Sequence, residues 1–123
     1  MRLLQKDAAE LTAEYGITVG RWEQYGVPEG TLPFGAMWSI VPPGGTSAED
    51  HHEEQELAVV ISGQGEVEST ATGDRRPTPV GTAALMGSYE RHVWHNLSER
   101  DPLVFLSIYW MPSGQRDEVG EVV

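Results

Sequence analysis

Short apolar segments separated by turn residues make up the hydrophobic pattern of this chain. The strongest are residues 56–61 and 103–110, which are rich in β-branched and aromatic residues, as buried strands are. Weaker segments of the same kind occur at 17–22, 34–41, 65–70, 80–86 and 92–96. Glycine and proline separate them, and residues 62–65 are predicted to form a hairpin turn. The pattern predicts an all-β domain, either a sandwich or a barrel.

The two ends of the chain give weaker signals. Residues 2–5 fit a short strand, but Leu4, Ala8, Leu11 and Tyr15 recur at helical spacing, so a turn or two of helix is an alternative. The charged segment from about 114 to 123 is expected to be a loose tail. A chain of 123 residues can build one core but not two, which predicts a single domain over 1–123.

Composition excludes several classes of function. The chain has no cysteine, which rules out disulfides, zinc–thiolate sites, iron–sulfur clusters and cysteine nucleophiles within it. Nineteen acidic residues against eight basic ones give a net charge of −11, without the basic patch that nucleic acid or an anionic membrane requires. No apolar run approaches the roughly 20 residues of a membrane span, and no signal peptide is recognisable. We therefore expect a cytoplasmic protein.

All four histidines lie in two short clusters, His51-His52 and His92-Val-Trp-His95. Imidazole and carboxylate are ligands that zinc, iron, manganese, copper and nickel share, so the clusters predict the two halves of one metal site. Alternate residues of a strand share a face, so Asp50 and His52 can point the same way, whereas His95 should face away from His92.

These residues resemble the two motifs of the cupin superfamily, G(X)5HXH(X)3–4E(X)6G and G(X)5PXG(X)2H(X)3N. The first motif runs from Gly44 to Gly63 and the second from Gly81 to Asn96, so together they span 44–96. Their metal-ligand positions fall on Asp50, His52, Glu56 and His92. Gly87 and Tyr89 replace the proline and the second glycine of the second motif. The resemblance implies a cupin-type antiparallel β-barrel, or jelly roll, that holds one divalent metal ion.

The ligand set differs from the usual one in this family, which has three histidines and one glutamate. Asp50 replaces one histidine, so the site is more anionic and its metal is open among zinc, iron, manganese and nickel, with zinc or iron favoured. One extra residue before Glu56 would turn His51 inward, with Glu49 as its partner. The spacing from Gly44 favours His52, and His51 stays a candidate. Asn96 is expected to be structural, closing the turn that follows it.

The resemblance further implies a small-molecule enzyme of the isomerase, dioxygenase, lyase or cyclase type, with chemistry at the metal. Glu56, Tyr89 and Arg91 are candidate catalytic groups, and Trp38 and Tyr109 are candidate pocket residues. Residues 33–38, 43–45 and 51–53 are also similar to the zinc cupins that join amines in hydrazine biosynthesis. The alternatives are a non-catalytic module that binds a small ligand and an accessory protein for another enzyme. A homodimer is expected, because small barrels of this kind often leave an apolar outer sheet and the N-terminal segment could exchange onto a neighbour.

Overall fold

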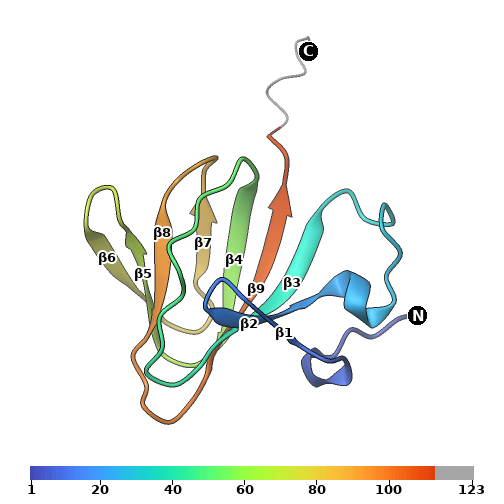
Figure 1. Cartoon of the computed structure of the whole chain (residues 1–123), viewed down its shortest axis with the longest axis horizontal. Coiled ribbons are helices and arrows are strands. Elements are labelled where there is room, and N and C mark those ends of the chain that lie inside the picture. The colour runs from blue at the N-terminus through green and yellow to red at the C-terminus, as the bar shows by residue number, and fades with distance from the viewer. Residues whose placement is uncertain (113–123) are drawn as a thin grey trace.

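The computed structural model describes residues 1–112, so the predicted tail at 114–123 lies outside the described residues. Within that range, strands dominate and form two antiparallel sheets that enclose the core, as a cupin-type barrel requires (Figure 1). The larger sheet has the order β1 (Thr12–Glu14), β2 (Ile17–Arg21), β3 (Gly35–Val41), β9 (Leu103–Trp110), β4 (Gln55–Ser62) and β7 (Ala83–Met86). The smaller sheet has the order β6 (Asp74–Thr78), β5 (Gly65–Ser69) and β8 (His92–Asn96). The prediction of an all-β fold is confirmed.

The core lies between the inner faces of the two sheets. On β4, buried Ala58 and Val60 alternate with half-buried Leu57 and Val59, as expected for a strand with one face inward. Aromatic packing joins the two sheets, because Trp94 of β8 stacks on Phe105 of β9 with ring centroids 4.3 Å apart. Valine, leucine and methionine side chains complete the cluster: Val19, Val41, Val60, Met86 and Leu103.

The predicted hairpin at residues 62–65 is wrong. β4 pairs with β7 and β9 of the larger sheet, whereas β5 pairs with β6 and β8 of the smaller one. The segment therefore crosses from one sheet to the other. Gly63 has a φ of 97°, and a Cβ atom there would lie 2.5 Å from the carbonyl oxygen of Pro102. A glycine in this sequence pattern permits a hairpin but equally permits such a close crossing of two backbones.

Several boundaries also differ from the prediction. β6 was not anticipated, because three of its five residues are charged and it contains Pro77, which is tolerated at the edge of a sheet. The strand predicted at 80–86 is limited to β7, and residues 2–5 form no strand. In place of an N-terminal helix there is one 3-10 turn, η1 (Lys6–Ala8), and a second follows β2, η2 (Trp22–Tyr25). Within residues 1–112, no helix is long and apolar enough to cross a membrane.

The larger sheet is apolar on its outer face as well. Trp38, Leu106 and Val59 are cross-strand partners on β3, β9 and β4, and each is only half-buried. Leu57 and Ile108 form the next row of the same face. This outer face is defined by residues Trp38, Ile40, Leu57, Val59, Leu106 and Ile108.

Candidate metal centre

The loop between β3 and β4 docks along β8 and brings the two histidine clusters together. Asp50 and His92 exchange two backbone hydrogen bonds, each 3.1 Å long, so they lie directly opposite each other. Two residues later, the carbonyl of His52 accepts a 2.6 Å hydrogen bond from the Tyr89 amide. These contacts hold Asp50 and His52 beside His92, which follows them in sequence only after four intervening strands.

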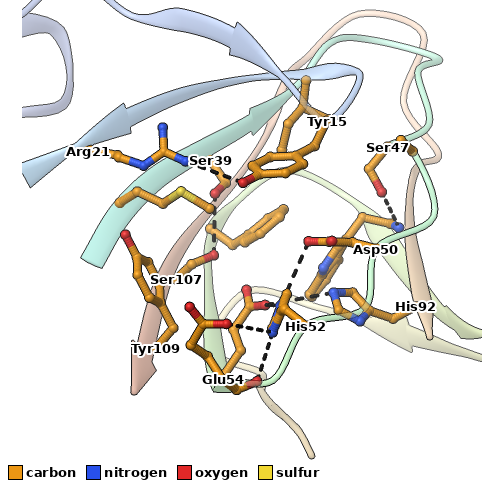
Figure 2. Close-up of a pocket in the computed structure, with 16 residues that line it drawn as sticks. Tyr15, Arg21, Ser39, Ser47, Asp50, His52, Glu54, His92, Ser107 and Tyr109 are labelled. Atoms are coloured by element: carbon orange, nitrogen blue, oxygen red, sulfur yellow. Dashed lines mark hydrogen bonds and ion pairs between the residues drawn. The ribbon is translucent and has the colours of Figure 1, made fainter. Parts of the chain in front are cut away.

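Backbone carbonyls fix the orientation of both inward imidazoles. Nδ1 of His52 donates to the Glu54 carbonyl at 2.8 Å, and Nδ1 of His92 donates to the Glu90 carbonyl at 2.9 Å. A carbonyl can only accept, so in each ring Nδ1 carries a proton and Nε2 faces the other donor groups (Figure 2). Metal-binding histidines are oriented in this manner, since the second ring nitrogen needs a partner of its own.

The donor atoms meet at separations that suit one metal ion. One ligand atom each of Asp50, His52 and His92 lies within 4.8 Å of the other two. Glu56 is not a member of this three-residue group, but its carboxylate oxygen lies 3.1 Å from Nε2 of His52 and 3.7 Å from Nε2 of His92, which makes it a candidate fourth ligand. Two donors on one zinc-sized ion are roughly 3–4 Å apart, given metal–ligand bonds of about 2.0–2.2 Å. The donor set is therefore chemically and geometrically suited to a divalent cation.

When no metal ion is bound, Nε2 of His52 carries a proton and donates it in a hydrogen bond to Glu56. The hydrogen bond to Glu56 raises the pKa of His52 to about 9, against the opposing effect of burial. The Glu54 carbonyl and the charges of Glu56 and Asp50 act in the same upward direction. A metal ion that binds Nε2 must displace this proton.

The centre lies on the wall of a cavity of about 320 Å³ inside the barrel. Apolar and aromatic side chains form much of the lining: Ile17, Met37, Trp94 and Phe105. Figure 2 shows Asp50, His52 and His92 on one side of this cavity, with Arg21, Tyr15 and Tyr109 across from them. Beneath it, the hydroxyls of Ser39 and Ser107 are fully buried and lie 3.3 Å apart.

The structure shows where His51 and His95 lie relative to the metal-ligand group. His51 is exposed and outside the metal-ligand group, so His52 is the inward residue of the pair, as the Gly44 spacing favoured. His95 faces the opposite side of β8 from His92, and its Nε2 lies 2.8 Å from Glu68 on β5. Motif spacing predicted the inward position of His52, and strand alternation predicted that His95 faces away from His92.

Three predicted pocket or catalytic residues do not line the cavity. Trp38 lies on the outer face, where its ring contacts that of Trp22 at a centroid distance of 6.3 Å. Tyr89 is 61% exposed, with a φ of 60° at the position where the cupin motif has glycine. The guanidinium of Arg91 is also exposed and lies 3.9 Å from a carboxylate oxygen of Glu49. Both residues precede β8 in a surface turn, so closeness to His92 in sequence did not bring their side chains inside.

Arg21 and Tyr15 are cavity residues that the sequence did not reveal. Both belong to the β1–β2 hairpin, far in sequence from either motif. Tyr109, in contrast, was predicted as a pocket residue and does line the cavity. The alternation of β9 carries Phe105, Ser107 and Tyr109 to the inner face.

The model of the cupin domain family matches residues 37–109, which include both motifs and the four candidate ligands. The chain belongs to the cupin family. A cupin 2 conserved barrel domain protein from Salinispora arenicola is 26% identical, with a TM-score of 0.76, and the match covers 96% of this chain and 94% of that one.

Other cupins with this fold have varied roles. The cupin domain of an XRE family transcriptional regulator from Enterobacter cloacae is 27% identical, covering 79% of this chain and 98% of that one, with a TM-score of 0.64. The polyketide cyclase RemF from Streptomyces resistomycificus is 18% identical, covering 89% and 78%, with a TM-score of 0.73, and shows the fold alone. The fold thus serves both enzymes and regulators, and function has to be argued from the site.

Proposed function

We propose that this cupin is a metal-dependent enzyme that acts on a small molecule inside the barrel. The observation that carries the proposal is the meeting of two oriented imidazole Nε2 atoms with the carboxylates of Asp50 and Glu56 on the wall of a cavity. A divalent ion bound there would supply a Lewis acid or an oxygen-activating centre. Structural zinc sites fill their coordination with protein ligands, whereas a site that faces a cavity leaves room for substrate.

The chain's own residues supply the rest of the proposed site. Glu56 is 6% exposed and hydrogen-bonds His52, so it can ligate the ion or accept a proton at its carboxylate. Trp94 and Phe105 form an apolar wall that excludes water from a bound ligand. A cavity of about 320 Å³ admits a small molecule and not a folded partner.

The proposed metal is zinc or iron, with manganese and nickel as the other candidates. Two imidazoles and two carboxylates, without thiolate, suit these divalent ions. Protein purified without added metal should contain close to one equivalent of one of them by elemental mass spectrometry. Replacement of that metal by reloading with each ion in turn will show which one supports turnover.

The decisive experiment compares metal-free and reloaded protein in a screen of small-molecule substrates. Chelation should abolish turnover, and one divalent ion should restore it. Full turnover by metal-free protein would refute the proposal. Ligand binding without turnover in the reloaded protein would favour the non-catalytic binding module instead.

A homodimer and a cytoplasmic location are further proposals from the sequence. The outer face of the larger sheet supports the dimer, because its central rows carry apolar side chains only, and a second acidic copy meets no like charge there. Leu57→Glu should convert a dimer to a monomer in light scattering at micromolar concentration. Leu97→Glu is the control, because Leu97 is 49% exposed beyond the end of β8. A wild-type monomer mass would overturn the dimer.

A further inference from the structure

The cavity has a second polar end, opposite the metal centre, that the proposed chemistry does not use. Arg21, Tyr15 and Tyr109 form this distal cluster, and Figure 2 shows their polar atoms gathered on the side of the cavity away from His92. The Tyr15 hydroxyl accepts a 3.4 Å hydrogen bond from Nη2 of Arg21. Burial raises the pKa of Tyr109, and the nearby Arg21 charge opposes that rise. The Tyr109 phenol is therefore a neutral hydrogen-bond donor at neutral pH.

The backbone is shaped to hold both tyrosines in place. Tyr109 is the cross-strand partner of Gly35, where any side chain would collide with the tyrosine ring. Tyr15 occupies the first position of the two-residue β1–β2 turn, with a φ of 56°, which costs a non-glycine residue about 1–3 kcal/mol. Its carbonyl accepts a 2.8 Å hydrogen bond from Ala48, so the turn is fastened to the loop that carries Asp50. Strain retained at the wall of a cavity is consistent with a role in ligand contact.

Charge limits what this cavity can accept. Among the described residues, Arg21 is the only lysine or arginine in the lining, and its guanidinium is already paired with Glu14. Three carboxylates line the same cavity: Asp50, Glu54 and Glu56. A divalent ion would be offset by Asp50 and Glu56, which leaves Glu54 without compensation. A phosphate or a second carboxylate on the ligand would find no unpaired cation.

We infer that the cavity selects ligands with at most one negative charge, which place a donor group at the metal centre and a neutral hydrogen-bond acceptor between Tyr109 and Arg21. This inference rests on the proposed function, since it takes the metal centre as the first anchor. The aromatic and thioether side chains between the two ends favour a flat, apolar body: Met37, Trp94 and Phe105. Tyr109 and Arg21 are specificity-determining residues in this arrangement, and Tyr15 positions Arg21.

The test uses zinc-loaded or cobalt-loaded protein and five probes of three matched kinds. Benzohydroxamate carries the metal-binding group alone, and its 3- and 4-carbamoyl derivatives add a neutral acceptor. The 3- and 4-carboxy derivatives add instead a carboxylate, which has a similar shape but carries a negative charge. We expect one carbamoyl probe to bind about tenfold more tightly than benzohydroxamate, as one good hydrogen bond allows. Neither carboxy probe should exceed benzohydroxamate.

Substitutions at the distal cluster test which residues cause the tighter binding of the carbamoyl probe. Tyr109→Phe and Arg21→Met should each remove most of the carbamoyl gain while leaving the metal content and benzohydroxamate affinity unchanged. Tyr89→Phe and Arg91→Met are matched controls outside the cavity and should retain the gain. Equal affinity of all probes, or preference for a carboxy probe, would overturn this inference while leaving the metal proposal intact. Protein that takes up no metal would overturn both.

Discussion

The two ends of strand β8 present polar side chains to the same inner face but use them differently. At one end, Asn96 donates from Nδ2 to the carbonyls of Val41, Pro42 and Asp101 at 2.9–3.0 Å and accepts from the Ser98 amide at 2.9 Å. Every polar atom of that side chain is occupied by backbone. At the other end, His92 commits Nδ1 to a carbonyl and leaves Nε2 toward a cavity.

This contrast separates structural from functional positions within one motif. The Asn96 end is closed by packed backbone, since Gly63 and Gly65 leave no room for side chains against Pro102 and Leu103. The His92 end stays hollow, because Ser107, which lines the cavity, and its cross-strand partner Ala58 are both small. Whether a buried polar group serves the fold or the chemistry depends on how many of its hydrogen bonds the protein itself satisfies.

The largest expected effect is the loss of metal in His92→Ala. This variant removes one imidazole and one wall of the centre, so metal affinity should fall at least 100-fold, while the β-sheet fold persists. Elemental analysis and circular dichroism measure the two effects. A variant that retains one equivalent of metal would show that the centre lies elsewhere.

Asn96→Ala should have the complementary result, a loss of stability without a change of ligand set. Three carbonyls and one amide would lose their partner, which should lower the free energy of unfolding by about 2–4 kcal/mol. Urea unfolding of the metal-free protein measures this. An unchanged midpoint would mean that water replaces the asparagine fully, and the contrast between the two ends would fail.

The pH dependence of metal affinity tests the pairing of His52 with Glu56 at the His92 end of β8. Because the pKa of His52 is raised to about 9 in the metal-free protein, protons compete with metal below that pH. Apparent zinc affinity should fall by about tenfold per unit as pH decreases from 9 toward 7, measured against a chelator of known affinity. The raised pKa of His52 also stabilises the metal-free fold. This stabilisation is complete below about pH 6.5 and is lost as pH rises through 9. Affinities that are constant across this range would contradict the His52–Glu56 pairing.

The smallest effect is expected for His95→Ala, between the two ends on the opposite face. Its ring contacts Glu68, a partly exposed pair worth about 0.2–1 kcal/mol. Metal content should not change, and stability should fall by no more than that amount. Loss of metal here, with retention in His92→Ala, would reverse the assignment of the two histidines.

The sequence predicted the parts of this site that follow from local alternation. Both β8 and β9 begin and end where the apolar pattern indicated, and Asp50, His52 and His92 meet as the motif spacing required. Trp38 was misplaced because both faces of β3 are apolar, so the pattern could not indicate which face was inward. Arg21 could not be predicted, since only the pairing of β2 with β3 carries it to the cavity.

The central position of β9 has a consequence for how the molecule is made. β9 is the last strand of the described residues, yet it lies between β3 and β4 and hydrogen-bonds to both. Until it emerges from the ribosome, the larger sheet consists of two unconnected halves, and the strand that carries Tyr109 and the floor of the cavity is missing. The cavity therefore cannot form while the chain is being translated up to β8, and its assembly depends on contacts between distant segments, which form slowly.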